Sequence, residues 1–570
     1  MTEQPADIPL LVSIGVSGHR ELGDARNVER VRALVQEQFA TLHRRLAAYG
    51  KPIEYLLLSP LAEGADRVFV EAVWAVEPRA RLLAPLPFAK AAYERSFATE
   101  ASVAEFNDYL QHPNCIEWLE LPGGEPGEYF DVGKYVVDSC DVVFFLHDGA
   151  EVDDGALDGG TSSVIRYAEH KAGCTIAAPG DRARTGMRPA AAGPHADLMA
   201  VYVDVSALRA RAVSARAGSA SLEGLDLDGF FGRICHHRTG ELRMALRGVR
   251  SREAFRDSVE AFSTGHFDLR ASRCQRRFGA QSTLVIWLAF LISVLVLMDW
   301  GSGGNQVFDP LGPLKKIVNW DSMVAAGLVT IVWLVHFFNR KDHLTEWVEN
   351  RYLAERLRHV SLFLDAGIPL SAILAQARED PAGRPLKKLW QSIYFHCLMR
   401  FRELGLAPLS PDRLKRDLLS PDGLPRRQLA WHLRRAMEKR RSHSRQKRLR
   451  SLLFVLSLST SLVAASAVAL EFETERLSTL FDVVSSFFSL LLASYAAFTQ
   501  LKENNRIASR YEVTCEQLAG LETDVYFTVL SDPALEMRRL QGLVMGNSEI
   551  LMKTTYDWLN AMQEKSPEWA

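Results

Sequence analysis

The sequence has few of the features of a disulfide-bonded or zinc-binding protein. Its seven cysteines are an odd number, and no two of them form a Cys-x-x-Cys pair. This pattern argues against a disulfide framework and a cysteine-based zinc site, and it fits reduced thiols. His236 and His237 are adjacent and would point to different faces of a helix. We therefore predict no metal site.

The chain also lacks a strong excess of charge of either sign. It has 67 Lys and Arg residues against 69 Asp and Glu residues. No basic amphipathic stretch is interleaved with aromatic residues, so we expect no nucleic-acid partner. The first residues, MTEQPADIP, have neither the basic nor the apolar segment of a secretory signal. We therefore expect the N-terminal domain to stay in the cytosol.

Long apolar runs are what the chain has in abundance. Residues 278–298, FGAQSTLVIWLAFLISVLVLM, carry no charge and are long enough as a helix to cross a hydrocarbon core of roughly 30 Å. A buried core helix is the alternative, but three further runs of the same kind favour membrane insertion. These further runs are residues 322–338, 451–470 and 483–501.

The charges that flank these runs predict a topology of two hairpins. Arginines precede the first run, and a basic segment at 439–450 precedes the third. Because Lys and Arg are retained on the cytoplasmic side, both termini and residues 341–450 should be cytoplasmic in the cell (inner) membrane. Residues 299–316 and 471–476 should then lie outside. The segment 439–450 would set this topology, and binding of a signalling lipid is the alternative.

The fourth run carries a stripe of small and polar residues on one helix face. The stripe consists of Asp482, Ser486, Ser489, Ala493, Ala496 and Gln500, which recur every three or four positions. Such a stripe suits either close helix packing or the wall of a water-filled pore. Asp482 at the outer end favours a cation vestibule, and we treat Asp482, Ser486, Ser489 and Ala493 as pore candidates.

The N-terminal part alternates between predicted strands and helices. This alternation predicts an α/β fold with a doubly wound parallel sheet and a ligand crevice at the carboxyl ends of the strands. The predicted strands are residues 9–17, 53–58, 81–86, 141–146, 174–178 and 198–205.

Glycine-containing turns follow several of these strands and supply the candidate ligand-binding residues. Glycines let backbone N–H groups approach a phosphate, and Arg20 could add a planar fork. The carboxylates of Glu63 and Asp66 are placed to accept from ribose hydroxyls. A plain turn is the alternative for each glycine, and His19 could equally cap its turn. The candidates are Ser17, Gly18, His19 and Arg20; Glu63, Gly64 and Asp66; Asp148 and Gly149; and Gly159, Gly160 and Thr161.

The motifs GVSGHR, SPLAEGADR, DVVFFLHDG and GGT ahead of a Tyr167-Ala168 helix resemble the SLOG superfamily over about residues 8–205. The resemblance implies binding of a nucleotide or an NAD-derived second messenger, with no other cofactor. Related LOG phosphoribohydrolases are enzymes with a PGGxGTxxE motif. Here Ser162, Ser163 and Val164 follow Gly160-Thr161 without the catalytic glutamate, so we expect no such enzyme activity.

Residues 225–570 resemble the SLATT membrane effector domains that accompany SLOG sensors. The resemblance lies in a two-span hairpin followed by a charged helix, which recurs with Arg351-Tyr352 after the first hairpin and Arg510-Tyr511 after the second. It implies a ligand-gated pore or channel formed by a homo-oligomer in the bilayer, similar to bacterial anti-phage effectors. A membrane-tethered hydrolase using Glu63 or Asp66, and a non-conducting anchored sensor, are the alternatives.

The sequence therefore predicts a sensor domain joined to an all-α four-span transmembrane domain with cytosolic helical extensions. The predicted divisions are 1–205 for the nucleotide-binding domain, 206–277 for a linker and basic helix, 278–340 for the first hairpin, 341–450 for a cytosolic helical region, 451–501 for the second hairpin and 502–570 for a helical tail.

Overall fold

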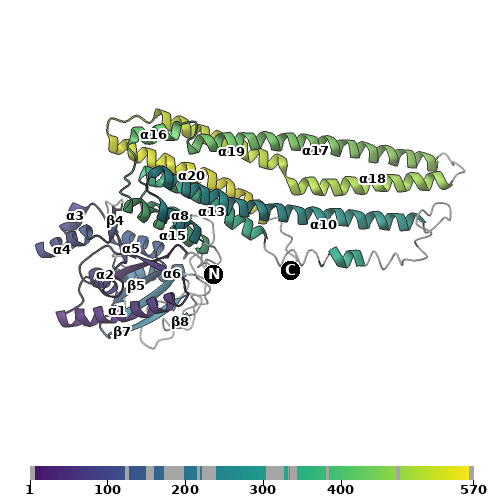
Figure 1. Cartoon of the computed structure of the whole chain (residues 1–570). Helices are drawn as coiled ribbons and strands as arrows, with labels where there is room; N and C mark the ends of the chain where they lie inside the picture. Colours follow the sequence, from purple (N-terminus) through teal and green to yellow (C-terminus); the bar gives the residue numbers. More distant parts are fainter. Residues whose placement is uncertain are drawn as a thin grey trace. The chain divides into compact units, whose positions relative to one another are not determined.

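The structure is a computed structural model, and its contacts divide the chain into two compact units (Figure 1). The first unit contains Met1–Ser258 and Gly367–Ala407, and the second contains Val259–Ala366 and Pro408–Ala570. The residues that the structure describes are 7–121, 128–148, 160–172, 198–214, 218–220, 239–302, 326–331, 333, 343–379, 384–469 and 475–563.

The first unit is built on an eight-stranded sheet with the order β4-β3-β2-β1-β5-β6-β7-β8. Neighbouring strands from β4 to β6 are parallel, and β7 and β8 are antiparallel additions. The chain starts in the middle of the sheet and winds outward on either side, so the order reverses between β1 and β5. The strands are β1 Leu10–Gly18, β2 Ile53–Leu58, β3 Arg81–Leu86, β4 Cys115–Glu120, β5 Val142–His147, β6 Met199–Asp204, β7 Arg209–Ser214 and β8 Gly218–Ala220.

Helices follow the strands because apolar residues recur at helical spacing behind a capping residue. Asp24 begins the first helix by accepting a hydrogen bond from the backbone N–H of Asn27, and Val31, Val35 and Phe39 form its buried face. The helices of this unit are α1 Ala25–Ala47, α2 Ala65–Val76, α3 Lys90–Glu94, α4 Glu100–Gln111, α5 Glu128–Ser139, α6 Thr161–Ala172, α8 Gly240–Gly248, α9 Arg252–Phe262, α14 Leu370–Glu379 and α15 Arg384–Glu403. The last residues of α9 belong to the second unit.

The parallel α/β sheet is confirmed, but the sequence prediction missed three strands. β4, β7 and β8 carry charged or small residues where a buried strand would carry apolar ones, because they lie at or near the edges of the sheet. The predicted linker at 206–277 contains two of these strands as well as α8 and α9. The strand predicted at 174–178 lies outside the described residues.

Residues 367–407 differ from their predicted place in a continuous helical region at 341–450. They form α14 and α15 and fold into the first unit. Lys388 of α15 is buried in an ion pair with Asp141, and its Nζ also donates to Ser13 Oγ at 3.2 Å. Ser392 Oγ accepts a hydrogen bond of 2.9 Å from the backbone N–H of Leu11. α15 thus covers β1 through polar contacts. The polar residues that make these contacts gave α15 the sequence pattern of a solvent-exposed helix.

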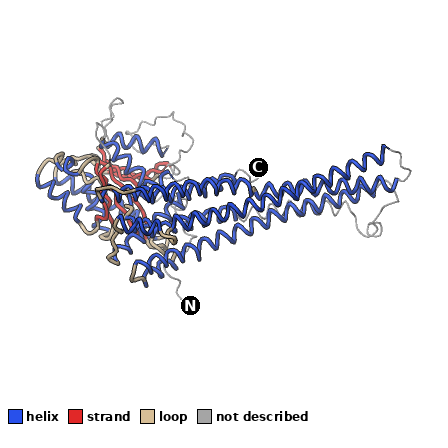
Figure 2. Tube along the Cα trace, turned by 90° about the horizontal axis from the view of Figure 1, so that it is seen from above, coloured by secondary structure: helices blue, strands red, loops and turns tan. Residues whose placement is uncertain are grey.

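The second unit consists of long helices. They are the π-helix η3 Ser263–Asp268, α10 Leu269–Ser302, α13 His343–Ala366, α16 Pro411–Leu419, α17 Leu424–Ala469, α18 Glu475–Lys502, α19 Asn504–Phe527 and α20 Pro533–Gln563. α18 packs against both α17 and α10 (Figures 1 and 2), and the rings of Phe290 and Phe487 lie 5.9 Å apart between α10 and α18.

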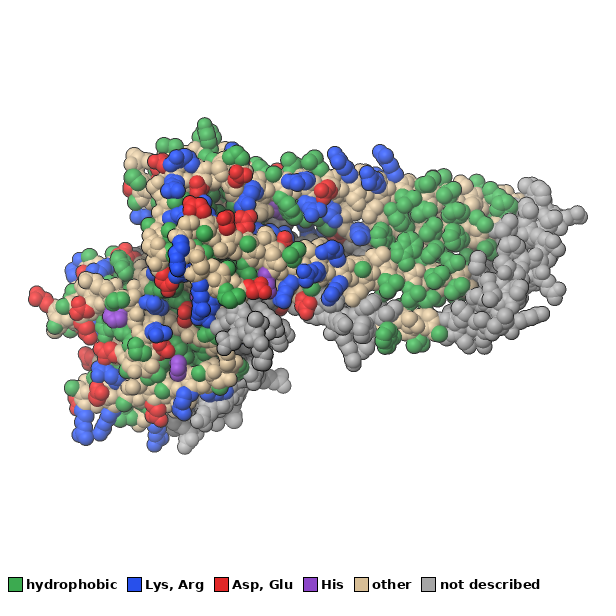
Figure 3. All heavy atoms as spheres, in the orientation of Figure 1, with side chains coloured by type: hydrophobic (Ala, Val, Ile, Leu, Met, Phe, Trp, Pro, Cys, Tyr) green, Lys and Arg blue, Asp and Glu red, His purple; other side chains and the backbone are tan. Residues whose placement is uncertain are grey.

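Three helical segments in the described residues are long and apolar enough to cross a membrane: Arg252–Leu297, Pro411–Ser466 and Phe481–Phe527. Large apolar side chains on them face outward; Leu291 is 51% exposed and Leu462 is 69% exposed. Figure 3 shows these side chains gathered into a green band over the long helices, bordered by Lys and Arg on the side away from the hairpin tip. The fourth predicted span, at 322–338, lies largely outside the described residues, and the structure supports three spans.

A single residue separates α18 from α19. Glu503 has φ 40° and ψ 34°, in the left-handed region that non-glycine residues rarely adopt. The next residue, Asn504, is buried and its Nδ2 donates to Ser442 Oγ at 3.0 Å and to Gln446 Oε1 at 2.9 Å. The start of α19 is therefore fixed to α17 directly after the turn.

Candidate functional site

The candidate site lies where the strand order reverses, at the carboxyl ends of β1 and β5. This is the place where open parallel sheets bind ligands, because the neighbouring crossovers diverge there. A cavity of about 330 Å³ opens at this edge. Its lining comprises Val16, Ser17, Gly18, His19, Arg20, Pro60, Ala62, Asp66, Tyr93, Tyr129, Val132, Gly133, Gly160, Thr161 and Val164.

Two glycines allow two chain segments, the end of β1 and the start of α2, to meet at the edge of this cavity. A Cβ on Gly18 would lie 2.3 Å from the Cβ of Ala65, and one on Gly64 would lie 2.1 Å from the carbonyl oxygen of Arg20. Gly64 also has φ +80°, which other residues rarely adopt. The backbone N–H of Ala65 donates to the carbonyl of His19 at 3.0 Å. Close packing of the backbone therefore accounts for these glycines, whether or not a phosphate binds.

A cluster of His19, His147 and Asp148 forms one side of the site. The two imidazole rings stack with centroids 4.6 Å apart, and Asp148 Oδ1 lies 3.3 Å from His19 Nε2 and 3.7 Å from His147 Nδ1. His147 Nε2 lies 2.7 Å from Ser162 Oγ. Burial and the neighbouring His19 lower the pKa of His147, so its ring is neutral at pH 7.

Neutral imidazoles and a carboxylate are ligands that divalent transition metals accept. The ligand atoms of His19, His147 and Asp148 lie within 4.8 Å of one another. The bond between His147 Nε2 and Ser162 would orient that ring, as partners of metal-bound histidines commonly do. The residues could therefore hold a metal ion, which the sequence analysis did not predict.

Arg20 supplies positive charge to the cavity. Its Nη1 donates to the carbonyl oxygen of Ser96 at 3.3 Å, and its guanidinium carbon lies 5.1 Å from the centroid of the Tyr129 ring. Among the described residues Arg20 has no ion-pair partner. Most of its donors therefore remain available, and Tyr129 holds its planar group in place.

Asp66 supplies a buried carboxyl group at the start of α2. It is 4% exposed, and its Oδ2 accepts a hydrogen bond of 3.1 Å from the backbone N–H of Ala62. Burial raises the pKa of Asp66 to about 7, although this hydrogen bond and the charge of Arg20 oppose the shift. The group therefore exchanges a proton near neutral pH, whereas the sequence analysis treated it as an ionised ribose contact.

Glu63 faces a different hollow beside the cavity. Its Oε1 accepts a hydrogen bond of 3.0 Å from the backbone N–H of Ala98. Burial alone would raise the pKa of Glu63, but hydrogen bonds from Ser102 and Ala98 and the charges of Arg67 and Arg20 lower it. The carboxylate orders the loop before α4.

The structure brings most of the predicted ligand-binding residues to one edge of the sheet. Seven of them line the cavity: Ser17, Gly18, His19, Arg20, Asp66, Gly160 and Thr161. Asp148 joins them through His19, Glu63 and Gly64 line the adjacent hollow with Arg20, and Gly149 and Gly159 lie outside the described residues. The sequence analysis gave no role to Tyr93, Tyr129, His147 or Ser162. His147 could have been found, because it ends a buried strand at the same edge.

Of the four pore candidates on α18, Ser489 occupies a helix contact. Ser489 Oγ lies 2.8 Å from Ser457 Oγ of α17, and Ser485 Oγ lies 2.6 Å from Ser461 Oγ. Ser489 of the predicted stripe and its neighbour Ser485 thus join α18 to α17, which supports the packing alternative for Ser489. Asp482 and Ala493 are exposed, and Ser486 is half-buried.

The site as a whole suits a small anion that carries hydroxyl or amide groups. Arg20 provides charge, two helices start beside the cavity, and Asp66 and the imidazoles provide exchangeable hydrogen bonds. Comparison of the chain with protein-family models and with curated proteins returns no match. The function is therefore argued from the geometry.

Proposed function

We propose that this protein is a membrane effector whose first unit binds a nucleotide or an NAD-derived signal and whose second unit responds in the bilayer. One observation carries the proposal. A single chain combines a cavity at the strand-order reversal of a parallel sheet with three helices of membrane-spanning length. The resemblance to SLOG sensors and SLATT effectors supports the same combination.

The ligand chemistry follows from the cavity lining. A phosphate would pair with Arg20, next to the helix start at Gly160-Thr161. The exposed ring of Tyr129 offers apolar surface for a base or ribose, and a protonated Asp66 would donate to the ligand instead of repelling it. A nucleotide has all three kinds of group.

In the membrane, the second unit would assemble as a homo-oligomer to form a pore. The helices of one subunit pack against one another through the serine contacts of α17 and α18, which leaves little room for water within a subunit. A conducting path would therefore run between subunits. We place the protein in the cell (inner) membrane with both termini cytoplasmic, as a four-span effector of anti-phage defence.

Ion flux tests the proposal directly. The purified full chain is reconstituted in liposomes loaded with a fluorescent ion indicator, and candidate nucleotides, including ADP-ribose and cyclic dinucleotides, are added. We expect flux only with a nucleotide that also binds in calorimetry. Binding without flux would instead identify a non-conducting anchored sensor, and absence of binding by any of these compounds would contradict the proposal.

A membrane-tethered hydrolase is a second candidate, which the state of Asp66 favours. A carboxyl group with a pKa of about 7 in a cavity is suited to general acid–base catalysis at neutral pH. Chromatography of the nucleotides after incubation with the full chain distinguishes the two. Turnover that is lost in Asp66→Asn would establish the enzyme, and an unchanged nucleotide would support the sensor.

A further inference from the structure

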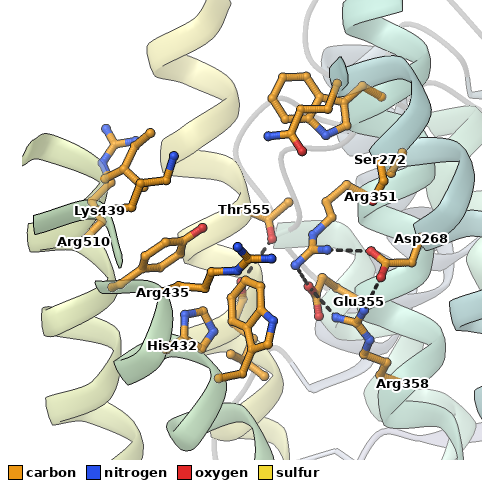
Figure 4. A pocket seen from close by; sticks show the side chains of 17 residues that line it. Asp268, Ser272, Arg351, Glu355, Arg358, His432, Arg435, Lys439, Arg510 and Thr555 are labelled. Atoms are coloured by element: carbon orange, nitrogen blue, oxygen red, sulfur yellow. Dashed lines mark hydrogen bonds and ion pairs between the residues drawn. The ribbon is translucent and has the colours of Figure 1, made fainter. Parts of the chain in front are cut away.

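A second cavity lies entirely within the second unit, among η3, α10, α13, α17, α19 and α20. Its volume is about 300 Å³, at the lower end of the range for small-molecule sites. Five basic side chains line it, together with two acidic ones (Figure 4): Arg351, Arg358, Arg435, Lys439 and Arg510, with Asp268 and Glu355.

One wall of this cavity is a neutral network of ion pairs. Arg351 lies 2.7 Å from Asp268 and 2.5 Å from Glu355, and Arg358 lies 3.2 Å from Asp268 and 2.8 Å from Glu355. Each carboxylate is thus shared by two guanidinium groups. Two positive and two negative charges cancel, and both guanidinium groups contact the same oxygen of Glu355.

The opposite wall carries positive charge that the cavity does not neutralise. Lys439 Nζ donates to the neutral Asn504 Oδ1 at 3.2 Å, and Arg510 has no ion-pair or side-chain hydrogen-bond partner in the part of the chain that the structure describes. Arg435 pairs with Glu438 at 2.9 Å, where both side chains are half exposed. Figure 4 shows Lys439 and Arg510 across the cavity from the network, with the side chain of Arg435 reaching between them toward Arg351.

The ring of Trp431 holds Arg351 of the network close to Arg435 of the opposite wall. The guanidinium carbons of Arg351 and Arg435 lie 5.8 Å and 5.6 Å from the centroid of the Trp431 ring. Cation–π contacts offset part of the repulsion between like charges but do not neutralise them. A bound anion would do so, and Arg residues are suited to phosphate because they donate two parallel hydrogen bonds.

The cavity lies next to the apolar parts of the membrane helices. Ser272 and Gln275 line it and precede the uncharged run at 278–298 by one or two helical turns. On the other side, Ile507 and Arg510 follow directly after α18, which ends at Lys502. A lipid headgroup at the edge of the bilayer would therefore be near these residues.

We infer that the cavity among η3, α10, α13, α17, α19 and α20 binds a phosphate-bearing anion between Arg510, Lys439 and Arg435. An anionic phospholipid headgroup and a soluble phosphate share this chemistry, and the adjacent apolar runs favour the lipid. The site is separate from the nucleotide cavity of the first unit, and its occupancy does not depend on the function proposed above.

Calorimetry on the purified full chain in a neutral detergent tests the site with three probes. These are a short-chain phosphatidylglycerol, a phosphatidylcholine of the same chain length and inorganic phosphate. We expect the phosphatidylglycerol to bind and the phosphatidylcholine not to bind. Removal of two charges in Lys439→Gln/Arg510→Gln should weaken binding by about tenfold or more, because hydrogen bonds to a charged group are lost. Tight binding of inorganic phosphate would identify a soluble source.

The matched control is Arg445→Gln/Arg448→Gln. It removes two exposed charges of α17 at positions that do not line the cavity. This control should change the affinity by less than about twofold. An equal loss in both double variants would overturn the proposal in favour of general attraction by surface charge, as would no binding of either anion. Arg435→Gln, at a half-exposed position, gives an independent reading if Lys439→Gln/Arg510→Gln does not fold.

Discussion

The two units bury charged groups in different ways. In the first unit the buried lysine of α15 is paired with the carboxylate of Asp141. The cavity of this unit combines Arg20 with Asp66, whose pKa is raised to about 7, and with His147, whose pKa is lowered. In the second unit a neutral network borders a cavity whose other wall is positive. The two cavities therefore differ in how many cations are left for an anion: Arg20 alone in the first unit, and the wall of Arg510, Lys439 and Arg435 in the second.

The largest effect is expected when the buried ion pair of the first unit, Lys388–Asp141, loses its lysine. Lys388→Met leaves the buried carboxylate of Asp141 without its ion-pair partner, although the hydroxyl and N–H of Ser13 still donate to it. The loss should be about 3–5 kcal/mol, as for other buried pairs that lose one member. Thermal unfolding of the full chain, followed by circular dichroism, measures it.

Two controls separate burial from charge. Lys134→Met removes an exposed pair with Asp131 and should cost less than about 1 kcal/mol. Adding Asp141→Leu to Lys388→Met should recover most of the stability, because no unpaired charge is left. Equal losses in the two lysine variants would show that Lys388 is not buried as described.

A single substitution in the network of the second unit, Glu355→Gln, should lower the stability of the fold and raise the affinity of the cavity for an anion. Burial alone would raise the pKa of Glu355, but Arg351 and Arg358 outweigh it and lower the pKa to about 2. Glu355→Gln should therefore reduce stability by about 3 kcal/mol at pH 7. The same variant should bind phosphatidylglycerol more tightly, because the cavity gains a net positive charge.

The pH dependence gives the sign of this contribution. A carboxylate with a depressed pKa stabilises the folded state above its ordinary pKa of about 4.5 and loses that effect as the pH falls toward about 2. The difference in unfolding temperature between Glu355→Gln and the unaltered chain should shrink over this window. A difference that is constant with pH would exclude Glu355 as its source.

In the first unit, Arg20→Ala should weaken nucleotide binding by about 1.5–3 kcal/mol, the value of a hydrogen bond to a charged group. The fold should be unaffected, because within the described residues the Arg20 side chain donates one hydrogen bond, to the Ser96 carbonyl. Arg26→Ala, at an exposed position on α1, is the matched control and should bind as the unaltered chain does. Calorimetry that gives equal affinities for both variants would place the ligand elsewhere.

The smallest expected effect concerns the proton on Asp66. Its raised pKa means that ionisation destabilises the folded state, so stability should fall as the pH rises through about 7. An anionic ligand should also bind roughly threefold more weakly at about pH 8 than at about pH 6. Asp66→Asn keeps the neutral form and should abolish this dependence. Persistence of the pH effect in the variant would assign it to another group.

Much of the first cavity could be predicted because local sequence determines it. The predicted strands 53–58 and 81–86 have the bounds of β2 and β3, and glycine turns at strand ends lie on one edge of any parallel sheet. The partners that complete the cavity could not be predicted in this way. Tyr129 comes from α5, and its approach to Arg20 depends on how that helix packs.

The second cavity could not be predicted from any one stretch of sequence. Its positive wall combines α17 with α19, and its neutral wall combines η3 with α13. Arg510 and Arg435 belong to segments whose polarity is that of solvated helices. Only the tertiary packing brings these residues around one cavity. The tertiary packing was also needed to show that Ser489 of α18 lies in a contact with α17.

The left-handed geometry of Glu503 interrupts two long helices of the second unit, α18 and α19. Glu503 is the one residue between the end of α18 and the start of α19, and Asn504 fixes that start against α17. The left-handed conformation costs about 1–2 kcal/mol. This cost is small enough for packing contacts elsewhere in the unit to offset it. Return of this residue to right-handed geometry would fuse α18 and α19 into one straight rod.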